Sequence, residues 1–184
     1  MDLQVAKKKV FAYTGGKAFD AKLPTLVFIH GAPHDHSVWG LQSRYFAHHG
    51  RGVLAPDLPG HGRSEGPPLA RIEDMAEWIT AVLDAAGVKA AALVGHSMGS
   101  LAVLECAARF SERVSRIVLL ATAFPMRVSP ELLGAANNDE DAARNMINVW
   151  SHSACAHYPG NPGPGFWVIG GNLRLMQRQK PGVL

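Results

Sequence analysis

The sequence predicts an α/β protein built on a mostly parallel, doubly wound sheet. Short, wholly apolar segments of strand length, such as residues 26–29 and 53–55, alternate along the first 124 residues with longer segments of helical spacing. Strands that alternate with helices favour a parallel sheet covered on both faces, with active groups at the carboxyl ends of the strands. The stretch that carries the most chemistry, residues 95–99, lies at one such end.

Composition and charge fit one globular domain with a sizeable core. Of the 184 residues, 47% are hydrophobic and 18% are charged, and the net charge is +3. Basic residues are spread out apart from residues 7–9, so no nucleic-acid-binding face is expected. Cys106 is expected in the core, and neither it nor Cys155 suggests a disulfide framework or a metal site. The sequence lacks the apolar core of a signal peptide and a membrane-spanning run, so we expect a cytoplasmic protein.

The first third of the chain predicts edge strands followed by two buried strands. Residues 3–14 mix apolar and polar residues before a Gly-Gly turn, which is typical of one or two edge strands. Residues 26–29 and 53–55 are apolar throughout, as expected of strands buried on both faces. Between them, residues 38–49 predict a helix. Its apolar side would carry Val38, Leu41, Tyr45 and Phe46.

The middle of the chain continues the alternation. Residues 72–86 predict the clearest amphipathic helix, because apolar residues recur at spacings of three and four, and Gly87 ends it. Residues 90–94 then predict a buried strand, residues 100–110 a helix of small apolar residues, and residues 114–121 the next buried strand.

After residue 124 the pattern changes, and it predicts an inserted helical segment without strands. Residues 129–150 predict two helices, the second beginning near residues 137–139. Residues 158–165 form an irregular loop rich in Pro and Gly, and residues 166–180 predict another short helix.

The sequence Gly-His-Ser-Met-Gly, residues 95–99, predicts a sharp turn between a strand and a helix with Ser97 at its apex. An apolar strand before and an apolar helix after are the setting in which Gly-x-Ser-x-Gly forms a nucleophile elbow. The hydroxyl has to stand clear of the sheet, and the flanking glycines are needed because strand and helix pack too closely for side chains. Ser97 is therefore the candidate nucleophile.

With these residues identified, the sequence resembles the α/β-hydrolase fold superfamily, of the small-molecule esterase, lactonase or C–C hydrolase type. The matching features, in order, are His30-Gly31 after a strand, Trp39, residues 57–64, and residues 95–99. The resemblance implies that residues 1–124 are the N-terminal part of the hydrolase core. Residues 125–184 would be an incomplete helical cap over the pocket, and the last strands of the sheet would be missing.

The resemblance also implies roles for single residues. Ser97 would attack a carbonyl carbon, and the backbone N–H groups of Ala32 and Met98 would form the oxyanion hole. Asp57 and His61 lie in a loop that is structural in the family. We therefore expect Asp57 to bond backbone groups of its own turn rather than to act in catalysis.

Substrate contacts are less constrained. The resemblance implies that His96 lines the pocket, and Phe124 and Trp150 could add an apolar wall, although packing of cap on core explains these aromatics equally well. Residues 34–36, His-Asp-His, lack further ligands at metal-site spacing, and there is no phosphate-loop or dinucleotide fingerprint. We expect no metal and no organic cofactor.

A serine hydroxyl needs a base, usually a histidine oriented by an acid. The only histidines after Ser97 are His152 and His157, which we interpret as cap residues. The resemblance therefore implies that the catalytic acid and histidine lie beyond residue 184.

The sequence is compatible with two functions. The first is a Ser hydrolase that acts on a small ester or related carbonyl compound through an acyl-enzyme at Ser97; acyl transfer, perhydrolysis and C–C or cyanohydrin cleavage would use the same elbow. The alternative is a catalytically incomplete, hydrolase-like module that binds a small apolar ligand or a partner. The sequence predicts neither the substrate nor the oligomeric state.

Overall fold

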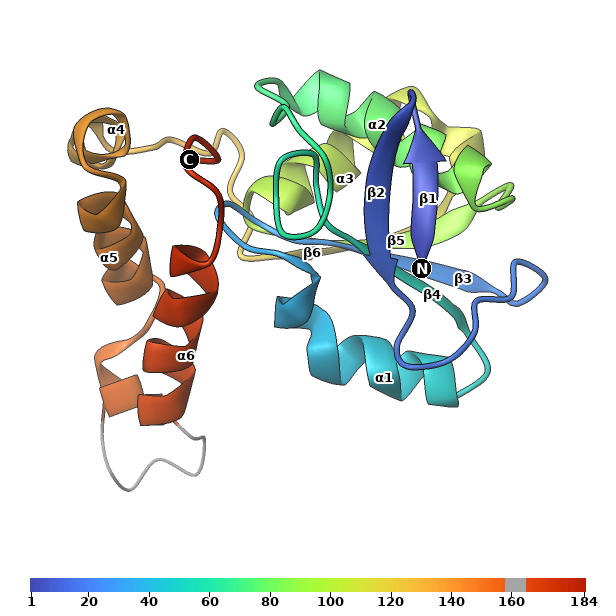
Figure 1. The fold of residues 1–184 in the computed structure, drawn as a ribbon, viewed down its shortest axis with the longest axis horizontal. Helices are drawn as coiled ribbons and strands as arrows, with labels where there is room; N and C mark the ends of the chain where they lie inside the picture. Colours follow the sequence, from blue (N-terminus) through green and yellow to red (C-terminus); the bar gives the residue numbers. More distant parts are fainter. Residues whose placement is uncertain (158–164) are drawn as a thin grey trace. The chain divides into compact units, whose positions relative to one another are not determined.

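The computed structural model describes residues 1–157 and 165–184, which form two compact units (Figure 1). The first unit holds residues 1–122 together with residue 183, and the second holds residues 123–182 together with residue 184. Nearly all of the loop predicted at residues 158–165 lies outside the described residues.

The first unit is built on a six-stranded sheet. Its strands are β1 (Asp2–Val5), β2 (Lys8–Tyr13), β3 (Thr25–Ile29), β4 (Gly52–Pro56), β5 (Ala91–His96) and β6 (Val114–Leu120). Their order across the sheet is β1-β2-β4-β3-β5-β6, and β4, β3, β5 and β6 run parallel. The β1–β2 hairpin joins antiparallel to β4. The prediction of a mostly parallel α/β sheet is confirmed.

Helices cover both faces of this sheet. They are η1 (His36–Trp39), α1 (Gly40–His48), α2 (Ile72–Ala85), α3 (Met98–Arg109) and η2 (Ser111–Arg113). Val27 and Ile29 of β3 pack in the cluster that contains α2 and α3, whereas Phe28 packs with Trp39 on the other face. Because successive residues of β3 point to opposite buried faces, residues 26–29 are all apolar.

The helix predicted at residues 38–49 is present, but its predicted apolar side is only half right: Val38 and Phe46 pack partly buried against the core, whereas Leu41 and Tyr45 do not. Leu41 is 83% exposed and Tyr45 is 58% exposed, while Trp39, Ser43 and Ala47 are buried. The segment begins as the short helix η1, which places Trp39 in the core. The Ser43 hydroxyl, inward because it lies four residues later, donates to the Trp39 carbonyl at 2.6 Å.

The strand predicted at residues 114–121 is also present as β6, but it is largely exposed rather than buried. Within the described residues β6 pairs with β5 alone, at the end of the strand order. Its apolar side chains consequently remain open to solvent, with Ile117, Val118 and Leu120 between 38% and 48% exposed.

All secondary-structure elements in the described residues of the second unit are helices. It contains α4 (Pro130–Asn138), α5 (Glu140–Trp150), η3 (Ala154–His157) and α6 (Gly165–Gln177). Ser129 and Asp139 cap α4 and α5 by accepting hydrogen bonds from the Leu132 and Ala142 N–H groups. These caps separate two helices that are nearly continuous in sequence. The assignment of this unit as a cap stays a prediction.

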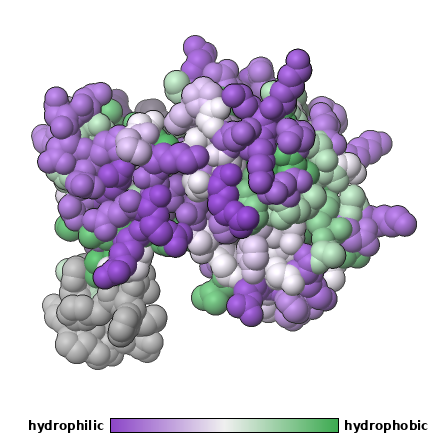
Figure 2. All heavy atoms as spheres, in the orientation of Figure 1, coloured by the Kyte–Doolittle hydropathy of each residue, from purple (hydrophilic) through white to green (hydrophobic). Residues whose placement is uncertain are grey.

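The side chains in Figure 2 are mostly hydrophilic, with hydrophobic atoms visible between them on the first unit. No helix in the described parts of the chain is both long enough and apolar enough to cross a bilayer. Cys106 is fully buried in α3, and Cys155 is exposed in η3; both are free thiols.

Candidate active site at the β5–α3 turn

Ser97 lies at the sharp turn that joins β5 to α3. Its backbone has φ 52° and ψ −124°, a conformation that non-glycine residues rarely adopt. The turn is fixed on both sides: the Ser97 N–H donates to the Leu120 carbonyl of β6 at 2.9 Å, and the Ser97 carbonyl accepts from the Ser100 N–H at 2.8 Å. A strained residue held by the surrounding hydrogen bonds is the arrangement expected of a functional site.

The two glycines of the motif allow the strand and the helix to approach closely. A Cβ atom on Gly95 would lie 2.4 Å from the Gly99 carbonyl oxygen. A Cβ atom on Gly99 would lie 2.4 Å from the His30 carbonyl oxygen and 2.6 Å from that of Ile29. The contacts are with backbone atoms, which cannot rotate away, so both positions require glycine.

The two candidate donors of an oxyanion hole are Met98, next to Ser97 in the chain, and Ala32, in the loop after β3. Met98 is the first residue of α3, so its N–H belongs to the helix N-terminus, where partial positive charge gathers. Gly31, which precedes Ala32, lies against the nucleophile, because a Cβ atom on it would be 3.0 Å from the Ser97 Cβ. The structure thus brings the loop that carries Ala32 to the turn that carries Ser97 and Met98.

His96 lies beside this loop and close to two aromatic side chains. Its Nδ1 atom is 3.3 Å from the position that a Gly31 Cβ would take. The His34 and Trp39 rings lie 6.3 and 6.4 Å from the His96 ring, both nearly perpendicular to it. Burial, followed by the neighbouring His34, lowers the pKa of His96 below its ordinary value. The imidazole next to Ser97 is therefore neutral at pH 7.

His30 is a buried structural link whose role the sequence did not reveal. Its Nε2 atom accepts the Leu58 N–H at 3.0 Å, so Nδ1 carries the proton and donates to the Gly31 carbonyl at 2.9 Å. Burial, with a contribution from His61, lowers the pKa of His30 to about 3. The one available signal was a histidine placed directly after a wholly apolar strand. This side chain ties the loop after β3 to the loop after β4.

Asp57 bonds backbone groups, as predicted. Its fully buried carboxylate accepts the His36 N–H at 2.7 Å and the Arg63 N–H at 2.9 Å, and it also bonds the His36 ring at 2.8 Å. Gly62 leaves room for it, because a Cβ atom there would lie 2.4 Å from Asp57 Oδ2. Both oxygens are used to hold two loops together.

Asp35, His36 and Asp57 bring possible metal-ligand atoms within 4.8 Å of one another. Asp35, however, accepts the Ser37 N–H at 2.8 Å and thereby caps η1, and Asp57 is engaged by two backbone N–H groups. We interpret the cluster as hydrogen-bonded turns, in which N–H donors already satisfy the carboxylate oxygens.

The other predicted substrate residues, Phe124 and Trp150, belong to the second unit. Phe124 is 84% exposed in the segment before α4, and Trp150 is 57% exposed at the end of α5. Their place in a substrate pocket stays a prediction. In the same unit, the His152 Nδ1 atom is 2.7 Å from the Asn148 carbonyl, a local contact at the end of α5.

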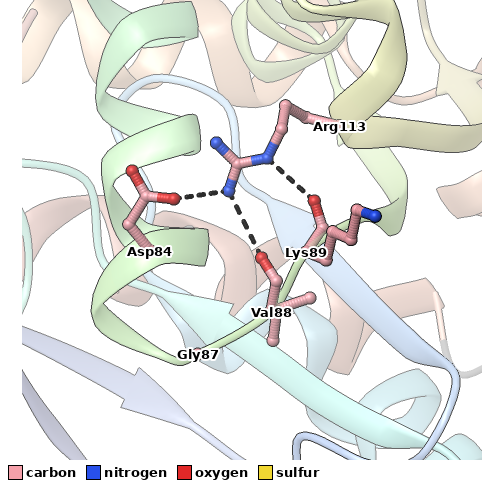
Figure 3. Close-up of a pocket in the computed structure, with 5 residues that line it drawn as sticks. All are labelled: Asp84, Gly87, Val88, Lys89 and Arg113. Carbon is pink, nitrogen blue, oxygen red and sulfur yellow. Dashed lines mark hydrogen bonds and ion pairs between the residues drawn. The ribbon is translucent and has the colours of Figure 1, made fainter.

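A surface pocket of about 390 Å³ lies at the opposite end of the sheet, where β5 and β6 begin (Figure 3). Its Arg113 donates to the Asp84 carboxylate at 2.6 Å and to the carbonyls of Lys89 and Val88 at 2.8 and 3.3 Å. The guanidinium joins the end of α2 to the start of β5, so we interpret this pocket as a structural joint.

Comparison with known proteins agrees with this geometry. Residues 24–162 match the family model described as alpha/beta hydrolase fold. The chain is 34% identical over 113 residues to the bifunctional esterase/perhydrolase DCH of Acinetobacter calcoaceticus, and 33% identical over 108 residues to the non-heme chloroperoxidase of Streptomyces lividans. These matches cover 59% and 58% of this chain but only 40% and 39% of the relatives.

Among solved structures, the chain is similar to the enol-lactonase from Burkholderia xenovorans LB400. The TM-score is 0.79 at 22% sequence identity, over 97% of this chain and 68% of that one. A likeness at this level of identity concerns the fold, and it extends over nearly the whole chain.

Proposed function

The chain belongs to the α/β-hydrolase family, and on this premise we propose that it acts as a Ser hydrolase on a small-molecule ester or related carbonyl compound. The observation that carries the proposal is the backbone of Ser97, whose positive φ at the β5–α3 turn lifts the hydroxyl from the sheet. The relative named as a bifunctional esterase/perhydrolase supports carbonyl chemistry at such a site.

In the proposed mechanism a base removes the Ser97 proton and the oxygen attacks the carbonyl carbon. The Met98 and Ala32 N–H groups stabilise the negative charge on the carbonyl oxygen, each by about 3–4 kcal/mol. The alcohol leaves with a proton, and water then hydrolyses the acyl-enzyme at Ser97. The proposal assigns the base and its orienting acid to sequence beyond residue 184, and no metal or organic cofactor takes part.

The test is intact-mass spectrometry before and after reaction with a fluorophosphonate, with Ser97→Ala as the control. We expect one adduct on the protein that carries the catalytic base and none on Ser97→Ala. An adduct that persists in Ser97→Ala would contradict the assignment. Absence of any adduct on the natural full-length protein would favour the hydrolase-like binding module instead.

If the 184-residue chain alone forms the Ser97-dependent adduct, the base lies within it. His152→Gln and His157→Gln would then show which imidazole is needed. Removing the histidine of a serine triad lowers turnover by about 10⁶-fold in a well-studied protease. A base assigned in this way would therefore be unmistakable.

A further inference from the structure

Trp39 carries a buried donor that finds no acceptor in the described part of the chain. The residue is 4% exposed, and its indole Nε1 atom lies without a hydrogen-bond partner. An indole N–H is a donor only and has no second tautomer, so it needs an acceptor placed beside it. A buried donor left without a partner costs about 1–3 kcal/mol, and native structures rarely retain one without a reason.

The Trp39 side chain is firmly positioned. Phe28 packs against its ring at 5.2 Å between centroids. The short helix η1 that carries it is capped by Asp35, whose carboxylate accepts the Ser37 N–H. The Asp57 carboxylate also accepts the His36 N–H, at 2.7 Å. The indole therefore cannot readily turn away to find a partner elsewhere.

The indole ring that carries this donor lies beside the residue that precedes the nucleophile. The Trp39 ring meets the His96 ring at 84°, with 6.4 Å between their centroids. His96 directly precedes Ser97, and both side chains lie against Gly31. Each has an atom within 3.3 Å of the position that a Gly31 Cβ atom would take. An oxygen atom bound between Trp39 and His96 would consequently belong to a molecule that reacts at Ser97.

We propose that the Trp39 indole N–H is a specificity-determining donor that binds an oxygen atom in the acyl part of the substrate. The preferred substrates would then be alkoxy-, hydroxy- or oxo-substituted acyl esters, or lactones with a second ring oxygen, rather than plain alkyl esters. The inference rests on the proposed role of Ser97 as nucleophile. A hydrogen bond in a protected space discriminates more strongly than one at the surface, because water does not compete for the donor.

The binding test uses two esters of the same shape, ethyl methoxyacetate and ethyl butanoate, which differ by an oxygen in place of a methylene. The protein is ¹⁵N-labelled Ser97→Ala, which prevents turnover, and the readout is the indole N–H signals of its four tryptophans. We expect methoxyacetate to move the Trp39 signal downfield and butanoate to leave it unchanged. Equal responses to the two esters, or no response to either, would overturn the proposal, and the second result would indicate a retained water.

The kinetic test compares Trp39→Phe with the unchanged protein, both in the form that carries the catalytic base, on the p-nitrophenyl esters of the same two acids. Trp39→Phe should lower kcat/KM for the methoxyacetate about tenfold more than for the butanoate, the effect of one hydrogen bond. Taking the ratio cancels the different intrinsic reactivity of the esters. Phe28→Leu is the matched control, because it alters the packing of the Trp39 ring and retains the N–H. It should change both esters by the same factor.

The roles of Ser97 and Trp39 can be refuted independently of each other. The indole measurement needs neither turnover nor Trp39→Phe, since the signals can be assigned sequentially. A protein that resists the fluorophosphonate while its Trp39 signal responds only to methoxyacetate would refute Ser97 as nucleophile and retain Trp39 as the oxygen-binding donor. A protein that reacts at Ser97 without discriminating the two esters would do the reverse.

Discussion

The conformation at Ser97 depends on neighbouring glycines, which have no side chain. A Cβ atom on Gly99 would lie too close to the carbonyl oxygens of Ile29 and His30. Ile29 is the last residue of β3, and His30 follows it at the start of the loop that carries Ala32. A single added methyl group at residue 99 would therefore disturb both halves of the proposed oxyanion hole.

We predict that Gly99→Ala lowers the free energy of unfolding by about 1–3 kcal/mol, the usual effect of overpacking. It should also slow fluorophosphonate reaction at Ser97. Urea denaturation and labelling rates measure the two effects.

Gly134→Ala is the matched control for this substitution. Gly134 lies within α4, and a Cβ atom there would meet nothing within 4 Å. Alanine should raise the free energy of unfolding by about 0.5–1 kcal/mol, since glycine is a poor helix former. Similar destabilisation by both substitutions would refute the steric argument at residue 99.

Residue-level roles were predictable where a motif has one geometric solution. The need for glycines around Ser97 followed from the motif itself, and the backbone-binding role of Asp57 followed from the family resemblance of its loop. The role of His30 did not, because its partners, Leu58 and Gly31, depend on how two loops meet in space. The unpaired indole of Trp39 was equally invisible, since a sequence does not show which donors lack acceptors.

Among the elements, α1 and β6 show how tertiary context changes exposure. Both were predicted as elements of the right type at nearly the right residues, and both have different exposure. For α1, one turn of η1 sets the rotation of the whole helix and places Trp39 and Ala47 inward. For β6, apolar composition predicts burial, but its position at the end of the strand order leaves it exposed.

We predict that Val118→Lys makes the chain less prone to aggregate. Val118 is 48% exposed on β6, and an apolar edge strand promotes pairing between molecules that a charged side chain opposes. The free energy of unfolding should change by less than about 0.5 kcal/mol. Light scattering at elevated temperature, together with urea denaturation, gives both quantities.

Leu41→Lys provides the comparison for the β6 substitution. Leu41 is 83% exposed on α1, so it adds the same charge on a helix that offers no free backbone edge. If it suppressed aggregation as strongly as Val118→Lys, net charge rather than the β6 edge would be responsible.

For the molecule as a whole, buried histidines couple stability to pH. His30 titrates near pH 6.5 when unfolded but has a pKa of about 3 in the folded protein, and burial also lowers the pKa of His61 and His96. The unfolded chain therefore binds more protons between these values. The stability that neutral His30 contributes is fully present above pH 6.5 and is lost as the pH falls toward 3.

We predict that the free energy of unfolding falls between pH 6.5 and pH 5 by up to about 1.4 kcal/mol per pH unit for each such histidine. Urea denaturation at pH 7, 6 and 5 measures the slope above the range where carboxylates titrate. His30→Gln should reduce the slope, whatever its effect on stability at pH 7. An unchanged slope would show that His30 does not carry this dependence.

The general architecture was predictable because it follows from local patterns repeated along the chain. Alternating apolar strands and amphipathic helices specify a parallel sheet with both faces covered, and the model that matches residues 24–162 confirms the family. The exposure of single faces and the pairing of buried polar groups were not predictable. They depend on neighbours that are distant in sequence.

The two cysteines differ in reactivity, so thiol labelling can report local unfolding of the molecule. Burial raises the pKa of the Cys106 thiol to about 11, whereas Cys155 is exposed. Since the thiolate is the reactive form, a maleimide at neutral pH attaches once to the folded chain, at Cys155. A second attachment requires α3 to leave the sheet, so the rate at which doubly labelled protein accumulates reports how often the helix behind Ser97 opens.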